Sequence, residues 1–457
     1  MNEKAIDNAA KSTVKQSKRN EIPEDLAYQI VLAKLGIIGV AIGILIGGYK
    51  LSFLQALLAA LVSSFGFIIP AWVAALGQKT GLPSLTLSRA TFGLYGNRAA
   101  KVVAWFNAFG WTILQLSISC WLLTALITQG HITKNPWGVG TGGIIAVVVL
   151  GFLIWQGQSW NHDIRVWLHG LFVILSLVVA GIAFNQVNWR IESYVPSTNW
   201  LEKWLPAVML AMVATSLIST MEAGNWGKQI KKGHYRNSTL VAALIGGGLP
   251  SYLLILAGLL LGYGVPDLSK QRLPFMAIYH LLPGWLSNSY YVVAVIILSL
   301  HAARSFKHAT HLTDPILPHV RITKTQMQIG QLLLAASCMA VLVIVPLKFF
   351  EQFSTWLSSI GIIIFSWFGV FLADYLLAHR QGYDASEVST TSKLHYHWEG
   401  ILAWLSAVFV GALTTQTALW HGPWAHGIFL NAGNGVLLAG LVGFLTIFIF
   451  KIIPLKQ

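Results

Sequence analysis

The sequence predicts an all-α polytopic membrane protein with about twelve membrane-crossing helices, because apolar stretches of suitable length fill most of the chain. Two further observations support this fold class: few charged residues, and an uneven distribution of lysine and arginine between the stretches. A helix needs roughly 20 apolar residues to cross about 30 Å of hydrocarbon. The expected spans are residues 32–48, 52–75, 99–126, 142–157, 166–184, 204–223, 240–263, 290–308, 328–349, 353–378, 400–418 and 428–453.

The composition agrees with a chain that lies mostly in lipid. Hydrophobic residues make up 55% and charged residues 10% of the 457 residues, and the mean hydropathy is +0.64. Soluble domains carry about 25% charged residues. Continuous apolar runs also exclude a membrane β-barrel, whose strands alternate between apolar and polar residues.

The net charge of +14 is explained by orientation in the bilayer. Basic residues such as Arg89, Lys101 and Lys231 gather in alternate connectors, whereas the intervening connectors carry few. Because cytoplasmic loops collect lysine and arginine, both termini are expected in the cytoplasm and the protein in the plasma membrane. No soluble module carries a basic patch, so nucleic acid is not an expected partner.

Four regions are expected along the chain. Residues 1–29 are polar, without the apolar core of a signal peptide, and are expected to be a disordered cytoplasmic tail. Residues 30–380 form a ten-helix core, residues 381–398 a cytoplasmic loop, and residues 399–457 two C-terminal helices with a short tail. Cys120 and Cys338 each lie inside an apolar span, which favours small buried side chains over a disulfide.

Signals of catalysis, cofactor binding or metal binding are poor, and an enzyme is not expected. The glycines of 138–143 match G-x-G-x-x-G without the βαβ unit that gives this motif its meaning. His308 and His311, like His395 and His397, are close pairs that lack the spacing of metal ligands. They are interpreted as solvated loop histidines.

The first and sixth spans contain residues that favour interrupted helices. Glycines recur at 36, 39, 43 and 47 in the first span, and Ser219, Glu222, Gly224 and Asn225 end the sixth. If the first ten spans form two inverted five-helix repeats, these two spans occupy equivalent places, where broken helices form a transporter's central site. Close helix packing through small residues is the alternative explanation of the glycine row.

The third span presents an aromatic ring and an amide on one helical face. Trp111 and Gln115 are four residues apart, so their side chains lie one above the other. An indole can stack on a flat heterocycle, and an amide can match a purine or pyrimidine edge. A packed tryptophan and a glutamine bonded to a neighbouring helix remain the alternative.

The connector between the second and third spans resembles a loop of the nucleobase-cation symporter-1 family, which includes the cytosine, purine, allantoin and hydantoin permeases. The loop carries Lys79-Thr80-Gly81-Leu82 and then Arg89, Phe92 and Gly93. The resemblance extends over residues 32–380. Its other motifs are Leu35-Gly36, Gly47-Gly48, Gly110-Trp111, Asn225-Trp226-Gly227-Lys228 and Ala373-Asp374-Tyr375-Leu376.

The resemblance implies a LeuT-like fold of five plus five inverted helices with two extra C-terminal helices. It also implies a permease that imports a small planar nitrogenous compound by alternating access, usually with Na⁺ or H⁺. Cytosine or a purine base is the first choice of substrate. Allantoin, a hydantoin or a thiamine-related pyrimidine stays open, as does a sensor of the same fold that binds its ligand without transport.

The resemblance also implies the substrate-binding residues. Trp111 stacks on the ring, Gln115 binds its edge, and backbone groups of residues 40–44 line the break of the first span. The stretch 216–225 of the sixth span closes the opposite wall. The full expected set is Trp111, Gln115, Ile42, Gly43, Ser216, Ser219, Glu222, Asn225 and Arg304.

The eighth span departs from sodium-dependent relatives. The two hydroxyl residues expected of a cation site fall on Ala302 and Ala303, whose methyl groups cannot coordinate Na⁺, and an asparagine falls on Arg304. Arg304 can replace the charge of Na⁺, bind an anionic substrate, or reach the cytoplasmic surface. The expected cation site, or its surrogate, comprises Val40, Gly43, Ser299, Ala302, Ala303 and Arg304, and the proton-coupling candidates are Glu222 and His301.

Overall fold

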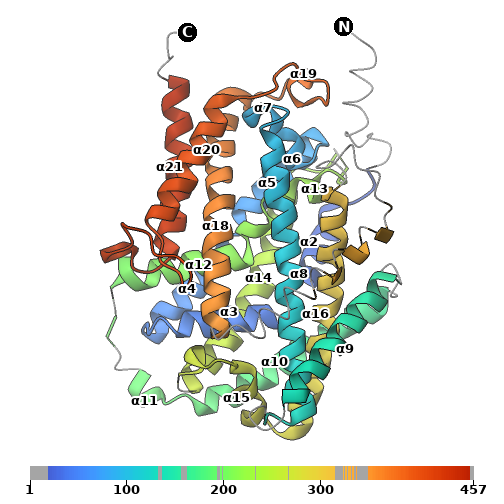
Figure 1. The fold of residues 1–457 in the computed structure, drawn as a ribbon, viewed down its shortest axis with the longest axis vertical. Helices are drawn as coiled ribbons and strands as arrows, with labels where there is room; N and C mark the ends of the chain where they lie inside the picture. Colours follow the sequence, from blue (N-terminus) through green and yellow to red (C-terminus); the bar gives the residue numbers. More distant parts are fainter. Residues whose placement is uncertain are drawn as a thin grey trace.

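The computed structural model describes residues 19–131, 136–155, 162–192, 199–231, 233–265, 267–313 and 348–452, together with a few residues of 193–198 and 314–347. This part of the chain is almost entirely helical and contains no β-strand. Figure 1 shows α8 (Asn97–Thr128), α16 (Gly284–Thr313), α18 (Phe349–Asp374) and α21 (Gly433–Ile452) running roughly side by side, with α9 (Pro136–Trp155) oblique to them. The short helices α6 (Ser84–Leu87), α7 (Arg89–Phe92) and α19 (Ala385–Val388) lie at one end, and α11 (Trp189–Glu192) and α15 (Pro274–Leu281) at the other.

Eight helices of the described chain are long and apolar enough to cross a membrane. They are built from α4 (Phe53–Phe65) with α5 (Ile68–Thr80), α8 (Asn97–Thr128), α10 (His162–Gln186), η3 (Trp200–Trp204) with α12 (Leu205–Thr215) and η4 (Leu217–Ser219), α14 (Arg236–Gly264), α16 (Gly284–Thr313), α18 (Phe349–Asp374) with η6 (Tyr375–His379), and α21 (Gly433–Ile452).

Three more of the expected spans have a helical counterpart. A pair of helices bent by 63°, α2 (Pro23–Lys34) and α3 (Ile37–Gly47), counts as one further span. Shorter apolar segments lie in α9 (Pro136–Trp155) and form α20 (Trp398–Leu413). More than half of the expected span 328–349 falls outside the described residues, as does Cys338.

The first helix begins earlier than the sequence suggested. Pro23 occupies the first turn of α2, where its fixed φ suits a helix and its missing N–H is not needed. The carboxylate of Asp25 accepts a hydrogen bond from the backbone N–H of Ile22, 3.1 Å away. Leu26 and Ile30 then pack into a small apolar cluster with Phe67. The expected disordered tail is therefore wrong for residues 23–29, while residues 1–18 lie outside the described part.

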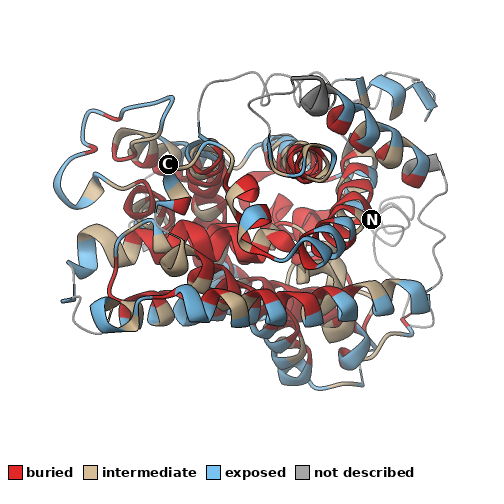
Figure 2. Cartoon of the chain, turned by 90° about the horizontal axis from the view of Figure 1, so that it is seen from below, coloured by how far each residue is buried: buried red, intermediate tan, exposed pale blue. Residues whose placement is uncertain are grey.

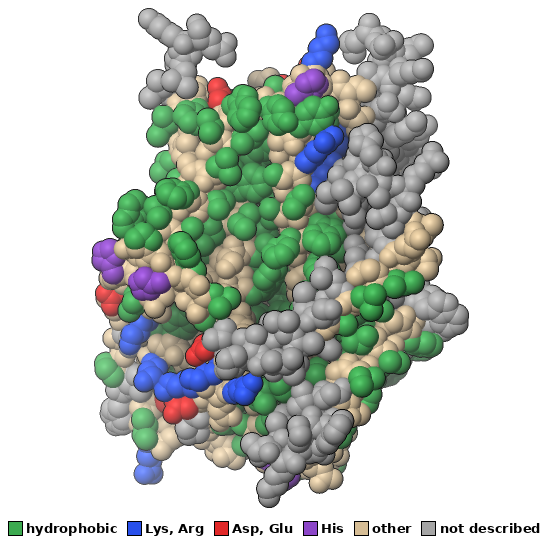
Figure 3. Space-filling view, viewed as in Figure 1, with side chains coloured by type: hydrophobic (Ala, Val, Ile, Leu, Met, Phe, Trp, Pro, Cys, Tyr) green, Lys and Arg blue, Asp and Glu red, His purple; other side chains and the backbone are tan. Residues whose placement is uncertain are grey.

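Burial separates an inner core from an outer apolar surface. Seen from below, the helix faces turned inward are buried and many of those turned outward are exposed (Figure 2). Large apolar side chains on that outer surface include Leu54 at 66% and Ile174 at 60% exposure. Hydrophobic side chains cover the middle and upper part of the face in Figure 3, and lysine and arginine lie toward its top and its lower third. An apolar surface of this kind suits contact with lipid.

Glycines bring α3 and α14 into backbone contact. A Cβ placed on Gly43 would lie 2.1 Å from the carbonyl oxygen of Ile255, and one placed on Gly258 would lie 2.0 Å from that of Val40. Gly39 likewise faces the side chain of Leu254. The packing explanation of the glycine row therefore holds for Gly39 and Gly43.

The loop that carries the family resemblance is anchored by buried polar contacts. The Arg89 guanidinium donates to the carbonyl oxygen of Val388 (2.7 Å), and the Thr91 hydroxyl donates to the Asp374 carboxylate (2.7 Å). Asp374 also lies 3.2 Å from the imidazole of His379 and 3.3 Å from the ammonium of Lys451. These contacts tie α7 to α18 and α21 at the end of the molecule where the cavity described below opens.

Candidate functional site

The first span is interrupted at Leu35 and Gly36. Leu35 is extended, with φ −76° and ψ 106°, and α3 starts again at Ile37. A helix end leaves its last carbonyl groups without intrahelical partners. One of them, the Leu32 carbonyl, accepts a hydrogen bond from Nε2 of His301 at 3.1 Å.

The break lies before the place that the sequence suggested. Residues 40–44 are regular helix, and Val40, Gly43 and Ile44 are buried. Gly43 faces α14 at backbone distance, which leaves no room there for a ligand. The expectation that backbone groups of residues 40–44 line the break is therefore wrong, because these residues lie within α3, Gly43 serves packing, and Ile42 alone of the stretch lines the cavity.

The sixth span is interrupted as well. Its helix α12 ends at Thr215, a single 3₁₀ turn covers η4, and a short helix α13 (Ala223–Gly227) follows. The side-chain amide of Asn107, on α8, donates to the carbonyl oxygen of Ile218 at 3.1 Å. Glycines then clamp α13 to its neighbours: a Cβ on Gly227 would lie 1.8 Å from the Ala74 carbonyl oxygen.

Lys34 joins the two interruptions. It is the last residue of α2, and its ammonium donates to the Thr215 carbonyl oxygen (2.8 Å) and to the Ser219 hydroxyl (3.2 Å). The ring of Phe67 lies 5.1 Å from the same ammonium, a cation–π contact. A positive charge from the first broken span thus sits at the carbonyl end of the second, where the helix dipole is negative.

A cavity of about 700 Å³ begins at these breaks and reaches the end of the molecule that carries α6 and α7. Its inner wall includes Lys34, Ile42, Trp111 and Gln115, and its outer part includes Arg89. The remaining polar lining is supplied by Gln29, Thr86, Lys101, Asn107, Thr215, Ser219, Glu222, Asn225, Lys228, Ser251, His301, Arg304, Ser305, His308 and His311. Burial lowers the pKa of both Arg89 and Lys228 from their ordinary values, because it removes part of the water around each charge.

Trp111 and Gln115 both line the cavity from α8. Each is 6% exposed, and neither the indole Nε1 nor the amide Oε1 has a hydrogen-bond partner among the residues that the structure describes. Buried polar atoms normally find partners, so two unsatisfied atoms on one wall of a cavity suit a ligand. The neighbouring Gly110 makes room for another indole, since a Cβ there would lie 2.2 Å from the ring of Trp356.

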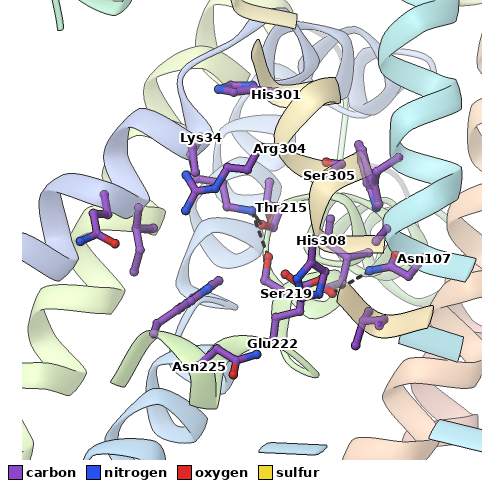
Figure 4. A pocket seen from close by; sticks show the side chains of 18 of the residues that line it. Lys34, Asn107, Thr215, Ser219, Glu222, Asn225, His301, Arg304, Ser305 and His308 are labelled. Carbon is purple, nitrogen blue, oxygen red and sulfur yellow. Dashed lines mark hydrogen bonds and ion pairs between the residues drawn. The ribbon is translucent and has the colours of Figure 1, made fainter. Parts of the chain in front are cut away.

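One face of α16 forms the wall beside α8. Leu298, His301, Arg304, Ser305 and His308 line the cavity at helical spacing, and Figure 4 shows Arg304 beside Lys34 and His308 beside Glu222. Nε2 of His308 lies 3.0 Å from a carboxylate oxygen of Glu222.

Arg304 stands out in this wall because it is exposed to the cavity. It forms no hydrogen bond or ion pair with the residues that the structure describes.

The structure brings most of the expected substrate residues to the cavity. Trp111, Gln115, Ile42, Ser219, Glu222, Asn225 and Arg304 line it, as does the proton candidate His301. Gly43 and Ser216 do not: the Ser216 hydroxyl donates to the Met212 carbonyl of its own helix at 2.9 Å.

The expected cation site is not assembled at the cavity. The Ser299 hydroxyl donates to the Val295 carbonyl oxygen of its own helix (2.8 Å). Ala302 and Ala303 pack into an apolar cluster between α16, α8 and α9. Of the expected set, Val40, Gly43, Ser299, Ala302 and Ala303 do not line the cavity, and Arg304 does.

Sequence reasoning missed Lys34, Asn107, Thr215 and His308. His308 was expected in a solvated loop, but α16 continues to Thr313 and places it inside the cavity. The signal was present in the spacing of His301, Arg304 and His308, which a helix brings to one face. Lys34 stood two residues inside the expected start of the first span, where a lysine is ordinary.

Comparison with known families and structures gives a consistent result. Residues 13–443 match the model of a family described as permeases for cytosine/purines, uracil, thiamine and allantoin. Two structures of Mhp1, a nucleobase-cation-symport-1 family transporter, are similar. The closed form with bromovinylhydantoin bound is 15% identical, covers 98% of this chain and 96% of its own, and has a TM-score of 0.65. The inward-facing form is 14% identical, covers 98% and 94%, and has a TM-score of 0.68.

A Na⁺-coupled sialic acid symporter in a substrate-bound outward-open state is more distant. It is 11% identical, covers 98% of this chain and 94% of its own, and has a TM-score of 0.55. No curated protein sequence matches the chain. At these low sequence identities the similarity shows the fold alone. It confirms the predicted all-α, LeuT-like fold class.

Proposed function

The chain belongs to the family of permeases for cytosine/purines, uracil, thiamine and allantoin, and on this premise we propose that it imports a small planar nitrogenous compound by alternating access. Membership makes it a multi-pass membrane transporter and confirms that it is not an enzyme. Cytosine or a purine base is the first choice of substrate, and allantoin, a hydantoin or a thiamine-related pyrimidine is the alternative. The plasma membrane, with both termini in the cytoplasm, is the proposed location.

The observation that carries this proposal is the pair of unsatisfied atoms on α8. The Trp111 indole offers a flat face for stacking and an N–H donor, and the Gln115 amide oxygen is an acceptor for a ring N–H or amino group. A nitrogen heterocycle supplies a partner for each of them. An apolar ligand would leave both polar atoms unsatisfied, which is costly in a buried site.

Alternating access is supported by the two interruptions. Half-helices on either side of a break can move relative to the helices packed against them, as expected for transporters built on inverted repeats. The cavity reaches the end that carries α6 and α7, and its lining includes Pro83, Leu85 and Lys228 from that end. If that end is cytoplasmic, this is an inward-open arrangement.

Coupling to Na⁺ is not part of the proposal. At each of the two helix ends one carbonyl oxygen that a cation could use already has a donor, namely His301 for Leu32 and Lys34 for Thr215. On α16, two alanines replace the oxygen ligands that a hard cation needs. We therefore propose that Lys34, in place of Arg304, supplies the charge of the missing cation, and that protons drive uptake.

Uptake and binding measured on the same protein test the function. In proteoliposomes, labelled cytosine is expected to accumulate, and a panel of purine bases, allantoin, hydantoins and pyrimidine alcohols ranks the substrates by competition. Saturable binding without accumulation for any member of the panel would favour the sensor. Absence of both binding and uptake across the panel would overturn the proposal.

Variants of Trp111 and Gln115 test whether these two side chains bind the substrate. Stacking of a base on an aromatic side chain contributes about 1–3 kcal/mol by alanine substitution, so Trp111→Ala is expected to weaken binding about tenfold or more. Gln115→Ala is expected to weaken it less, and Trp111→Phe to restore part of the stacking. Trp285→Ala, at a side chain that is 65% exposed, is the matched control. Equal affinity of Trp111→Ala and the control would contradict the assignment.

A further inference from the structure

The cavity carries an excess of positive charge. Among the described residues that line it are the basic side chains of Lys34, Arg89, Lys101, Lys228 and Arg304, whereas Glu222 is its one carboxylate. Ionisable residues within spans are rare and usually face a partner or a water-filled pathway. A ligand site of this composition therefore favours negative charge.

Three of these six charges have partners among the described residues. Glu222 lies 3.0 Å from His308, and Lys34 is bonded to Thr215 and Ser219. Arg89 donates to the carbonyl oxygen of Val388 in the loop that leads to α20.

The side chains of Lys101, Lys228 and Arg304 form no hydrogen bond or ion pair with the described residues. Of these three, Arg304 is the one that lies beside Lys34 at the interrupted spans (Figure 4). Its guanidinium is exposed to the cavity and has neither a hydrogen bond nor an ion pair with the described residues. Its neighbour Lys34 is also positive, and the two charges repel each other (Figure 4), while the single carboxylate of Glu222 attracts both and is already paired with His308. An anion bound between them would relieve that repulsion.

The ring site and the guanidinium stand on adjacent helices. Trp111 and Gln115 belong to α8, Arg304 belongs to α16, and the two helices pack closely through one apolar cluster that includes Ala108, Phe109 and Ala302. All three side chains line the same cavity. A ring held against Trp111 can therefore direct an acidic group toward α16.

We propose that the substrate is an anionic planar nitrogen heterocycle whose negative charge pairs with Arg304 while its ring is held by Trp111 and Gln115. The charge is a ring carboxylate or an acidic ring N–H that is ionised near neutral pH. This inference rests on the proposed permease function and changes its preferred substrate, because it places an anionic ring ahead of neutral cytosine. A guanidinium has two parallel N–H donors, which can bind the two oxygens of a carboxylate. They can equally bind a ring carbonyl oxygen and the deprotonated ring nitrogen next to it, and either pairing explains an arginine at this place.

Matched pairs of probes test the charge of the substrate. Uracil is compared with orotate, which is uracil with a ring carboxylate, and hypoxanthine with urate, an oxidised purine that is an anion at neutral pH. Acetate serves as a carboxylate without a ring. Equilibrium binding to the purified full-length protein is expected to be at least tenfold tighter for orotate or urate than for its neutral partner, with no competition by acetate.

Variants of Arg304 then test whether its guanidinium is the source of the preference for an anionic ligand. Arg304→Gln is expected to lose the preference for the anion, by tenfold or more, while binding of the neutral partner stays within about threefold. Arg304→Lys keeps the charge without the planar fork and is expected to lie between the two. Lys307→Gln, three residues along the same helix and exposed outside the cavity lining, is the matched control.

The outcomes separate this inference from the proposed function. Tighter binding of uracil and hypoxanthine than of orotate and urate by the wild-type protein would overturn the anionic class and leave the permease intact. An anion preference that persists in a folded Arg304→Gln protein would overturn the role of Arg304. Failure of these probes and of the whole panel of nitrogenous rings would overturn the proposed function as well. The wild-type comparison decides the substrate class even where Arg304→Gln fails to fold.

Discussion

At the scale of single residues, Lys34 connects the two interrupted spans. Its ammonium binds a carbonyl oxygen and a hydroxyl of the interrupted sixth span, and it comes from the end of the interrupted first span. A buried carbonyl that loses its donor costs about 1–3 kcal/mol, and a helix end without its cation also loses a favourable dipole contact. The two breaks are therefore coupled through one side chain.

Lys34→Met tests this coupling, because it keeps the length of the side chain and removes the charge. Uptake by proteoliposomes is expected to fall at least tenfold at equal protein content, since the Thr215 carbonyl and Ser219 lose their donor. Lys50→Met, at an exposed lysine beyond the end of α3, is the control and is expected to transport normally. Full uptake by Lys34→Met, without added Na⁺, would show that the tethered charge is not needed.

Residues whose role follows from helical geometry could be predicted, and those whose role depends on a distant partner could not. Trp111 and Gln115 were found because a spacing of four places them on one face of any helix. Glu222 takes His308, at 3.0 Å, as its partner from among the basic residues of the cavity. That choice depends on how far α16 extends and on its rotation, which no local pattern determines.

At the scale of the elements, the contact between α3 and α14 depends on glycine. Gly43→Ala would place a methyl group 2.1 Å from the Ile255 carbonyl oxygen, so the helices have to move apart. Forcing extra atoms into a packed core costs typically 1–3 kcal/mol. The thermal midpoint of the purified protein is expected to fall, as measured by thermal unfolding in detergent.

Gly170→Ala is the matched control, because Gly170 lies within α10 and a Cβ there meets no atom within 4 Å. Alanine is favoured over glycine in a helix by about 0.5–1 kcal/mol, so this variant is expected to be unchanged or slightly more stable. An equal response of the two variants would contradict the packing role of Gly43.

The same contact explains why the place of the first break could not be predicted. Gly36, Gly39 and Gly43 look alike in the sequence, yet Gly36 lies at the interruption and the other two pack against α14. Which glycine serves which purpose depends on where α14 crosses α3. The number and order of the spans follow from hydropathy, whereas the break follows from tertiary contact.

At the scale of the whole molecule, the energy source of transport has to agree with the charge of the substrate. Moving one elementary charge across the membrane potential involves about 2.3 kcal/mol per 100 mV, which opposes the import of an anion into a negative interior. A proton carried with the anion removes this cost. The pair of Glu222 and His308, which faces Arg304 and Lys34 in the cavity, is the proposed place for that proton.

Proton-driven uptake is therefore expected in proteoliposomes with an acidic exterior, and it is expected to persist when Na⁺ is replaced by choline. Glu222→Gln and His308→Gln are each expected to abolish accumulation above the external concentration, because the pair can no longer gain and release a proton between the two sides. Exchange of labelled for unlabelled substrate needs no net proton movement and is expected to continue in both. His301→Asn is the comparison, since His301 bonds the Leu32 carbonyl and is not part of the pair. Uptake that collapses without Na⁺ while the proton gradient is held, or accumulation that survives in Glu222→Gln, would contradict proton coupling at this site.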